Sequence, residues 1–329
     1  MTDCLAISKS AIARASGLLA DGQLVAFPTE TVYGLGADAT NDRAVARIFA
    51  AKYRPAFNPL ISHVASAAAA FDLGVETPIA TVLASAFWPG PLTLVLDRRP
   101  DCPVARLTTA GLDKIAVRVP AHAAAQALLT HFGKPVAAPS ANPSGRISPS
   151  TADHVMRGLA GKIDLILDGG PCESGLESTV VDASTDQALI LRPGGITRNA
   201  VADALKAAGF AGHIAGPIAG PTAVTQPVQP VAPGQLASHY APRAAVRLNA
   251  TKAAADEELI GFGSVAGSGR LALSLSASGD LIEAAANLFA MLHRADDTGT
   301  AKIAIAPVPD NGLGEAINDR LRRAAAPRR

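Results

Sequence analysis

Two positively charged side chains, Lys52 and Arg54, are separated by one residue and followed by Asn58 and His63. A guanidinium can bind two phosphate oxygens at once, and an ammonium beside it brings a second cation to the same group. Lys52 alone would be explained by the preference of cations for helix C-termini, and a lone histidine beside a strand is usually structural. As a set, the segment predicts a phosphate-binding site at a helix end, with Lys52 and Arg54 partly exposed.

The segment 139–151 is rich in serine, proline and glycine and directly follows an apolar run at 136–138. Small hydroxyl residues and glycine allow backbone N–H groups to approach a phosphate or a ribose closely. An ordinary turn is the alternative, in which Ser150 or Thr151 caps the next helix, and we expect that cap in either case. The segment is a second candidate for nucleotide contacts.

Further polar residues lie at the ends of apolar runs. Arg118 ends one run, Glu177 and Ser178 precede a second, and Arg192 ends a third. Each of these signals is weak on its own. The sequence contains no G-x-x-x-x-G-K-[ST], so the familiar P-loop is excluded. The glycines between 261 and 269 have the wrong spacing for a dinucleotide-binding loop and lead into another predicted strand.

The elements that must position these residues alternate between strands and helices, as in an α/β fold. We expect a helix over 12–19 and a helix capped by Asn41 that ends near 52–54, because Pro55 disfavours helical geometry before it. A polar turn should follow the first strand. Strands are predicted at 24–27, 60–64, 92–96, 115–119, 136–138, 165–167, 179–181 and 189–191.

After residue 210 the chain becomes rich in proline and glycine, which cannot sustain a helix or a central strand. We interpret this run as a link between two domains. A small α/β domain is expected beyond it. Its predicted strands are 245–248, 259–262, 271–275 and 302–305, and its predicted helices are 280–294 and 314–324.

Composition limits the classes of protein. The 329 residues exceed the usual size of one core, and 49% hydrophobic against 17% charged residues favours packed structure. A net charge of +1 gives no broad basic field for nucleic acid, and the arginines from Arg320 to Arg329 are typical of a solvated helix face.

Cys4, Cys102 and Cys172 include no C-x-x-C pair, which argues against a disulfide framework or a cysteine zinc site. The N-terminus lacks a signal-peptide pattern, so a cytoplasmic protein is expected.

Six motifs follow one another in a specific order: FPTETVYGLG, AKYRPAFNPLISH, AVRVPAH, APSANPSGRISPST, ESTVVD and LRPGGIT. In these motifs the chain closely resembles the Sua5/YrdC/YwlC family, the threonylcarbamoyl-AMP synthases. The resemblance covers residues 8–197, and the later HYAP at 239–242 resembles the two-domain Sua5 form. Tyr53 stands where many members have glycine, which leaves the spacing of the two cations intact.

The resemblance implies an α/β fold with a YrdC-like twisted mixed-sheet catalytic domain over 1–210. A linker that can act as an active-site lid is expected over 211–242, and a smaller, Rossmann-like C-terminal Sua5 domain over 243–329. The implied enzyme is a nucleotidyltransferase that makes L-threonylcarbamoyladenylate and pyrophosphate from L-threonine, bicarbonate or CO2, and ATP. This reaction is the first step of t6A formation at adenosine 37 of tRNA, and a separate threonylcarbamoyl transferase complex then uses the product.

The resemblance also implies residue roles. Lys52 and Arg54 are expected to be catalytic. The residues implied in L-threonine binding are Thr31, His63, Arg118 and Ser178. The residues implied in ATP binding are Lys52, Arg54, Asn58, Ser140, Asn142, Ser148, Arg192, His239 and Tyr240. Mg2+ is expected to accompany ATP on its phosphates without a dedicated protein site, and neither a membrane nor stable tRNA binding is expected.

Two other interpretations come from different classes of protein. The first is an RNA-binding module, which is suggested by the concave basic surface that this fold has in some relatives. The near-neutral net charge and the lack of interleaved basic and aromatic residues count against it. A carbamoyltransferase of the hydrogenase-maturation type contains a related domain. It would need C-x-x-C zinc motifs and a much longer chain, and neither is present.

Overall fold

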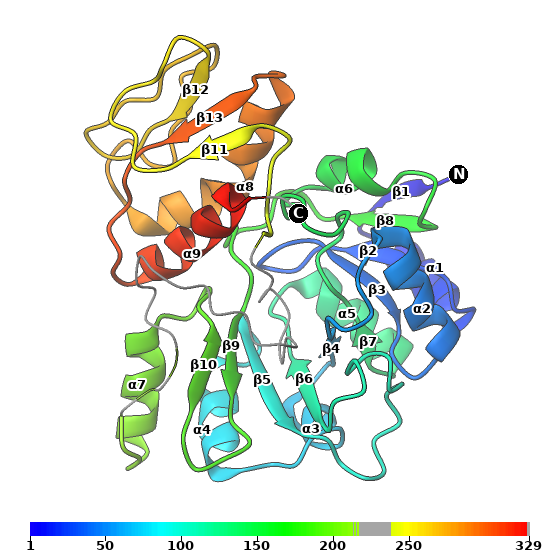
Figure 1. The fold of residues 1–329 in the computed structure, drawn as a ribbon. Coiled ribbons are helices and arrows are strands. Elements are labelled where there is room, and N and C mark those ends of the chain that lie inside the picture. Colours follow the sequence, from blue (N-terminus) through cyan, green and yellow to red (C-terminus); the bar gives the residue numbers. More distant parts are fainter. Residues whose placement is uncertain (213, 215, 217–237, 328–329) are drawn as a thin grey trace.

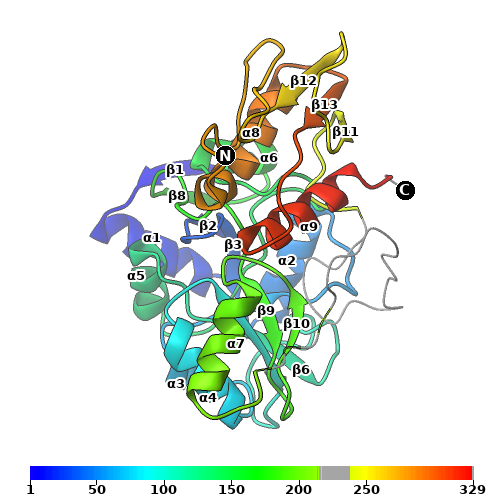
Figure 2. The same cartoon turned by 90° about the vertical axis from the view of Figure 1, so that its left-hand side faces the viewer.

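The structure is a computed structural model, which describes residues 1–212, 214, 216 and 238–327. These residues form a larger N-terminal domain and a smaller C-terminal domain, each built on its own sheet (Figures 1 and 2). Most of the proline- and glycine-rich run that the sequence predicts as a linker lies outside the described residues.

The N-terminal domain is built on a ten-stranded sheet. Its strands are β1 (Asp3–Ala6), β2 (Val25–Phe27), β3 (Gly34–Asp38), β4 (Ile61–His63), β5 (Leu92–Asp97), β6 (Lys114–Arg118), β7 (Val136–Ala137), β8 (Leu165–Asp168), β9 (Thr179–Asp182) and β10 (Leu189–Arg192). The strand order is β1-β8-β2-β3-β7-β4-β6-β5-β9-β10. The sheet is mixed, because β4 pairs with β6 and β5 with β9 in parallel, whereas β5 pairs with β6 antiparallel.

Helices cover both faces of this sheet. Successive side chains of a strand point to opposite faces, so a strand whose residues are all apolar needs cover on both sides. In β2, Val25 and Phe27 pack in the cluster that includes residues of the first and fifth helices, whereas Ala26 packs in the cluster on the other face. All three are fully buried. The helices are α1 (Lys9–Ala20), α2 (Asp42–Lys52), α3 (Ala67–Phe71), α4 (Pro78–Phe87), α5 (Ala123–Phe132), α6 (Ala152–Leu159) and α7 (Arg198–Ala207).

The ends of two helices near the predicted site follow the signals in the sequence. The Asn41 side chain accepts backbone N–H groups at the start of α2, and the Thr151 hydroxyl does so at the start of α6, as predicted. Helix α2 ends at Lys52, three residues before Pro55. Tyr53 then adopts a left-handed φ of 53°, the conformation that favours glycine after a helix.

The C-terminal domain has a parallel three-stranded sheet formed by β11 (Ala245–Arg247), β12 (Glu257–Ile260) and β13 (Lys302–Ile305), with β13 in the middle. The helices are α8 (Leu281–Asp297) and α9 (Leu313–Ala325), and both contribute to one core cluster with the strands. In both views α9 lies between this sheet and the N-terminal domain (Figures 1 and 2). Within the described residues, no helix is long and apolar enough to cross a membrane.

The structure confirms most predicted strands but corrects three points. Sequence reasoning missed β1, and it missed β3, which follows the polar turn predicted after β2. The strand predicted at 271–275 is wrong, because only Ser274 forms an isolated bridge there. Ala272 has a φ of 46°, and the Glu258 carboxylate accepts the backbone N–H of Leu271 at 2.9 Å. The segment also bonds to the backbone just after β12, where the Gly261 N–H donates to the Leu273 carbonyl and the Leu275 N–H donates to the Gly261 carbonyl, both at 2.8 Å, so it pairs there at one residue without forming a strand.

Candidate active site

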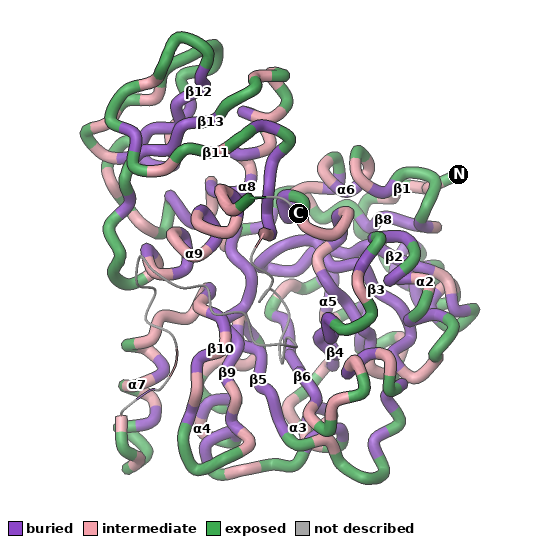
Figure 3. Tube along the Cα trace, in the orientation of Figure 1, coloured by how far each residue is buried: buried purple, intermediate pink, exposed green. Residues whose placement is uncertain are grey.

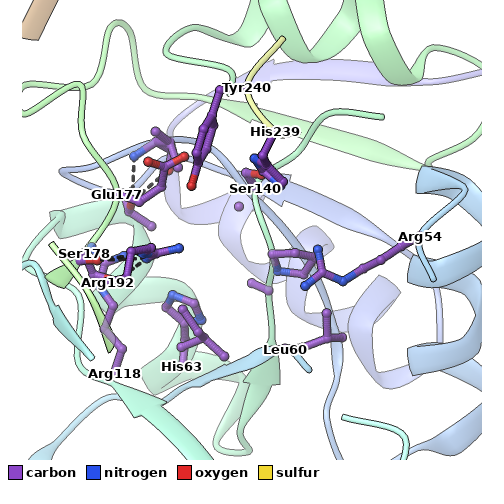
Figure 4. Close-up of a pocket in the computed structure, with 16 residues that line it drawn as sticks. Arg54, Leu60, His63, Arg118, Ser140, Glu177, Ser178, Arg192, His239 and Tyr240 are labelled. Carbon is purple, nitrogen blue, oxygen red and sulfur yellow. Dashed lines mark hydrogen bonds between the residues drawn. The ribbon is translucent and has the colours of Figure 1, made fainter. Parts of the chain in front are cut away.

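A pocket lies where β4 and β6 end and β9 begins, and the segment leading into β11 closes it (Figure 4). Because β4 and β6 are parallel and in register, His63 lies beside Arg118 at their carboxyl ends. The cavity measures about 50 Å³. The polar residues that line it are Thr29, Arg54, His63, Arg118, Ser140, Glu177, Ser178, Arg192, His239 and Tyr240.

Arg118, the predicted partner of the threonine carboxylate, is paired with a carboxylate of the protein. Its Nη2 donates to Glu30 Oε1 at 2.7 Å, and its Nε donates to the Gly90 carbonyl at 3.3 Å. The other oxygen of Glu30 accepts the backbone N–H of Ala121 at 3.1 Å. Both charged side chains are buried. The pair therefore holds the guanidinium in one orientation at the pocket wall.

His63, also predicted to bind threonine, is held neutral beside this pair. Burial, and then the charge of Arg118, lower the pKa of His63 to about 3. Its Nδ1 is buried and has no hydrogen-bond partner in the part of the chain that the structure describes. A buried, unpartnered ring nitrogen at the pocket wall is suited to a hydrogen bond with a bound group.

Ser178 and Arg192 form a hydrogen-bonded pair at the ends of β9 and β10. Arg192 donates to the Ser178 carbonyl at 2.8 Å and to its hydroxyl at 3.1 Å. The Ser178 hydroxyl also lies 2.7 Å from that of Thr93 on β5. Burial lowers the pKa of Arg192, and the charge of Arg320 adds to this shift. A bound anion would relieve both effects.

Lys52 is fully buried, with 1% of its surface exposed, and the prediction of partial exposure is wrong. Its Nζ donates to the Ser140 carbonyl at 2.5 Å and also to the Asn142 carbonyl. The physical reason is that the 139–149 loop folds over the end of α2, where the Ser144 N–H donates to the Lys52 carbonyl at 2.8 Å. Burial, and then the charge of Arg54, lower the pKa of Lys52 well below its usual range.

Arg54 lines the pocket and is also more buried than predicted, with 9% of its surface exposed. Its Nε and Nη2 donate to the carbonyls of Asn58 and Pro59 at 3.1 and 2.8 Å. Burial lowers its pKa to about 9. Both polar atoms of the Asn58 amide are buried, and no described residue forms a hydrogen bond with them. Unpaired buried polar atoms are unfavourable, so they indicate a place where a ligand group is expected.

The serine-rich loop contributes to the pocket directly and indirectly. Ser140 is one of the lining residues, whereas Asn142 and Ser148 are not. The Asn142 amide nitrogen donates to two carbonyls of its own loop, and its Oδ1 is buried without a partner. The Ser148 hydroxyl donates to Glu177 Oε1 at 2.6 Å. In this conformation Ser148 therefore contacts the pocket through Glu177.

Thr31 likewise supports a neighbour. It is fully buried, and its hydroxyl lies 2.8 Å from that of Thr29, which lines the pocket. The Thr29 hydroxyl also donates to the Val32 carbonyl at 2.7 Å. The FPTETVYGLG motif thus supplies Thr29 and Glu30 to the site, although sequence reasoning selected only Thr31.

His239 and Tyr240 occupy the side of the pocket opposite His63 and Arg118 (Figure 4). Tyr240 is fully buried, and its ring stacks on Phe289 of α8 with centroids 5.6 Å apart. Its hydroxyl and the Nδ1 of His239 are buried, and neither has a hydrogen-bond partner within the described ranges 1–212 and 238–327 or at residues 214 and 216. Figure 3 shows the buried path of this segment as it enters the C-terminal domain. The two residues therefore both line the pocket and pack against the second domain.

The lining carries more positive than negative charge. Arg54 and Arg192 line the pocket beside two neutralised side chains, Arg118, which is paired with Glu30 at 2.7 Å, and Glu177, which is paired with Arg320 at 2.9 Å. Among the described residues, no group of three or more histidine, cysteine, aspartate or glutamate side chains could hold a metal ion. The described side chains therefore suit an anionic ligand and form no cage for Mg2+.

Comparison with known proteins identifies the family. The model of the Sua5, YciO and YrdC family, described as telomere recombination, matches residues 17–194, and that of the threonylcarbamoyl-AMP synthase C-terminal domain matches 196–326. The chain belongs to the Sua5 family of threonylcarbamoyl-AMP synthases. As a member of this family it is a nucleotidyltransferase, and the predicted mixed α/β fold with two domains is confirmed.

Relatives with the same name match over nearly the whole chain. The threonylcarbamoyl-AMP synthase of Pyrococcus abyssi is 41% identical over 325 residues, covering 94% of this chain and 93% of the relative. That of Bacillus subtilis is 39% identical over 344 residues, covering 100% and 96%. The crystal structure of P. abyssi Sua5 complexed with L-threonine has a TM-score of 0.86 at 39% identity, covering 99% of this chain and 97% of that one.

Proposed function

We propose that this pocket synthesises L-threonylcarbamoyladenylate and pyrophosphate from L-threonine, bicarbonate or CO2, and ATP, the first step of t6A formation in tRNA. The observation that carries the proposal is the buried pair Lys52 and Arg54, whose described hydrogen bonds go to backbone carbonyls and to no carboxylate. Buried cations in excess are unfavourable unless an anion compensates them. The carboxylate of threonine and the phosphates of ATP would supply that compensation.

The two substrates are assigned to different walls of the pocket. We assign the threonine carboxylate to Arg118, with His63 and Ser178 beside it. We assign the phosphates to Arg54 and Lys52, supported on the nucleotide side by Asn58, Ser140 and Arg192. Thr31, Asn142 and Ser148 remain predicted ligand contacts, and in this conformation each of them bonds to a protein group.

The substrate supplies its own nucleophile, so no catalytic triad is required. The neutral threonine amine attacks CO2, a C–N bond forms and the nitrogen loses a proton. An oxygen of the resulting carbamate attacks the α-phosphorus of ATP, the bond to the β-phosphate oxygen breaks and pyrophosphate leaves. The protein contributes positioning and stabilisation of the charge that develops on the phosphates. Arg54, which lines the pocket in a low-dielectric environment, is placed for the second task.

Mg2+ enters the proposal only as a companion of ATP, because this ion is usually held by substrate phosphates and water. No protein residue is assigned to it. The downstream threonylcarbamoyl transferase complex and the cytoplasmic location belong to the same proposal. Stable tRNA binding is not part of it.

We also propose that His239 and Tyr240 form a lid. A cavity of about 50 Å³ is far smaller than the roughly 300–1,000 Å³ of typical ligand pockets, so these two residues must move before ATP binds. When closed, such a lid excludes water from a labile mixed anhydride. The rest of the predicted linker, 217–237, lies outside the described residues.

The test of the proposed reaction is pyrophosphate release from ATP by the full chain in degassed buffer. We expect release to require both L-threonine and added bicarbonate, and mass spectrometry to detect the adenylate. L-Serine, which lacks the methyl group of threonine, and L-valine, which lacks its hydroxyl group, serve as matched controls. Equal release without threonine would show that the pocket acts on another substrate.

A further inference from the structure

A buried arginine of the C-terminal domain reaches the wall of the pocket. Arg320, on α9, has no exposed surface, so the solvated helix face predicted from the sequence is wrong for this residue. Its Nε donates to Glu177 Oε2 at 2.9 Å, and its Nη1 donates to the Pro193 carbonyl at 2.8 Å. Its guanidinium carbon lies 5.3 Å from the centre of the Tyr240 ring. One side chain therefore contacts three segments around the pocket.

These contacts lie one residue away from two predicted ligand-binding residues. Glu177 precedes Ser178, and Pro193 follows Arg192. Arg192 in turn donates to the carbonyl and the hydroxyl of Ser178. A guanidinium is planar and its donors point in fixed directions. The Arg320 side chain thus sets the spacing of the two backbone segments that carry Ser178 and Arg192.

Stability alone is a weak explanation for this buried charge. A buried ion pair often contributes little compared with apolar residues of the same volume, because both ions lose their hydration. Nη1 has a second acceptor in Asp319 Oδ2 at 2.9 Å, but Nη2 of Arg320 is buried without a hydrogen-bond partner among the described residues. The orientation of the guanidinium is therefore maintained although one nitrogen is left unsatisfied.

We propose that Arg320 is a positioning residue of the active site, which holds Ser178 and Arg192 in their relative places. The C-terminal domain thereby completes the site as well as covering it. The inference rests on the proposed function for its kinetic readout, whereas nucleotide affinity provides a readout that is independent of the reaction.

The test compares two substitutions on α9 in the full chain. Arg320→Lys keeps the positive charge beside Glu177 but removes the planar guanidinium, which donates to Glu177 and to Pro193 in two fixed directions. Glu315→Gln is the matched control, because Glu315 pairs with Arg198 of the N-terminal domain at 2.7 Å and does not line the pocket. The measurements are kcat and KM for L-threonine, and the Kd of a non-hydrolysable ATP analogue by calorimetry, with melting temperatures recorded for both variants.

We expect Arg320→Lys to lower kcat/KM for threonine and to weaken analogue binding, each at least tenfold, with Glu315→Gln within twofold of wild type. A purely structural charge pair would tolerate lysine, so values within threefold of wild type for a folded Arg320→Lys would overturn the proposal. If wild type shows no threonine dependence, the proposed reaction fails, and the analogue Kd alone decides the role of Arg320.

A second comparison applies if Arg320→Lys does not fold. The double variant Glu177→Gln/Arg320→Met removes both buried charges and is compared with Glu177→Gln alone. We expect the double variant to bind the ATP analogue at least tenfold more weakly than the single variant. Equal affinities would show that Arg320 acts only by neutralising Glu177.

Discussion

The two walls of the pocket treat their cations differently. On the threonine side, Arg118 is neutralised by Glu30, and both side chains are fixed by further hydrogen bonds. On the proposed nucleotide side, Arg54 and the neighbouring Lys52, which does not line the pocket itself, donate to backbone carbonyls in each hydrogen bond that the structure describes for them. A carbonyl is a dipole without net charge, so it orients a cation without cancelling its charge. The uncompensated wall therefore suits a polyanion, and the compensated wall suits a single carboxylate.

The largest effect is expected on the nucleotide side. Arg54→Ala should lower kcat/KM for threonine-dependent pyrophosphate release by about 10²- to 10³-fold, because a preorganised charge in a water-poor site is lost. Arg99→Ala, which breaks an exposed pair with Asp101, is the control and should stay within twofold. Melting curves correct for any unfolded fraction. Activity above one-third of wild type would remove Arg54 from the phosphate site.

On the threonine side the effect should be smaller and confined to one substrate. Arg118→Ala should weaken L-threonine binding by about 10- to 100-fold, which corresponds to the loss of hydrogen bonds to a charged group, and should change ATP affinity less than threefold. Part of the loss comes from Glu30, which then repels the carboxylate. Arg118→Ala/Glu30→Gln should therefore recover some affinity by calorimetry. An equal loss for both substrates would contradict the separation of the two walls.

The neutral histidine on the threonine side makes stability depend on pH. The pKa of His63 is about 3 in the folded protein, against about 6.5 in the unfolded chain. Between these values the unfolded state binds the extra proton, so the contribution of His63 to the free energy of unfolding falls as pH decreases below 6.5, by at most about 1.4 kcal/mol per pH unit.

Urea unfolding at pH 7 and pH 5 measures this dependence. His63→Gln should have a shallower pH dependence than wild type, whereas His131→Gln, at an exposed position on α5, should keep the wild-type slope. The same slope in all three proteins would show that His63 does not contribute.

Tyr240 lies across from both walls, so its substitution should affect the product more than either substrate. Tyr240→Ala should raise the rate of adenylate hydrolysis roughly threefold to tenfold, because the ring no longer excludes water. Tyr240→Phe keeps the ring and should protect the product nearly as well as wild type. Chromatography of the adenylate over time measures its hydrolysis rate. Equal rates in all three proteins would show that the segment only connects the two domains.

The smallest effect concerns Tyr53, between the two cations of the nucleotide wall. Its φ of 53° is unfavourable for any residue with a Cβ, by roughly 1–2 kcal/mol. The Lys162 ammonium, 4.7 Å from the centre of its ring, offsets part of this strain. Tyr53→Gly should therefore raise the free energy of unfolding by about 0.5–1 kcal/mol in urea, with unchanged turnover. A decrease would mean that the ring contact outweighs the strain.

The sequence predicts the local features of this molecule well. The end of α2 follows from Pro55, and the cap of α6 follows from Thr151, because both depend on neighbouring residues. Strand β3 was missed because its glycines suggest a turn. A Cβ at Gly36 would approach Phe27 and Val136 to 2.9 Å, so this strand needs glycine for packing.

Features that depend on distant segments could not be predicted in the same way. Lys52 appeared exposed because a helix end is usually solvated, but a loop some 90 residues later in the chain covers it. Arg320 looked like part of a solvated basic face, since nothing near it in sequence indicates Glu177. The motifs contain Glu30 and Glu177, but nothing in the sequence indicates that these carboxylates pair with Arg118 and Arg320, which come from distant segments.

The small size of the cavity has a kinetic consequence. If ATP binds here as proposed, a space of about 50 Å³ requires His239 and Tyr240 to move before the nucleotide associates. The observed association rate should then rise with ATP concentration at first and level off at the opening rate. The apparent Kd is also larger than that of the open form, by the inverse of the fraction of molecules that are open. Substitutions that loosen the contact between Tyr240 and Phe289 could therefore tighten nucleotide binding while leaving every phosphate contact unchanged.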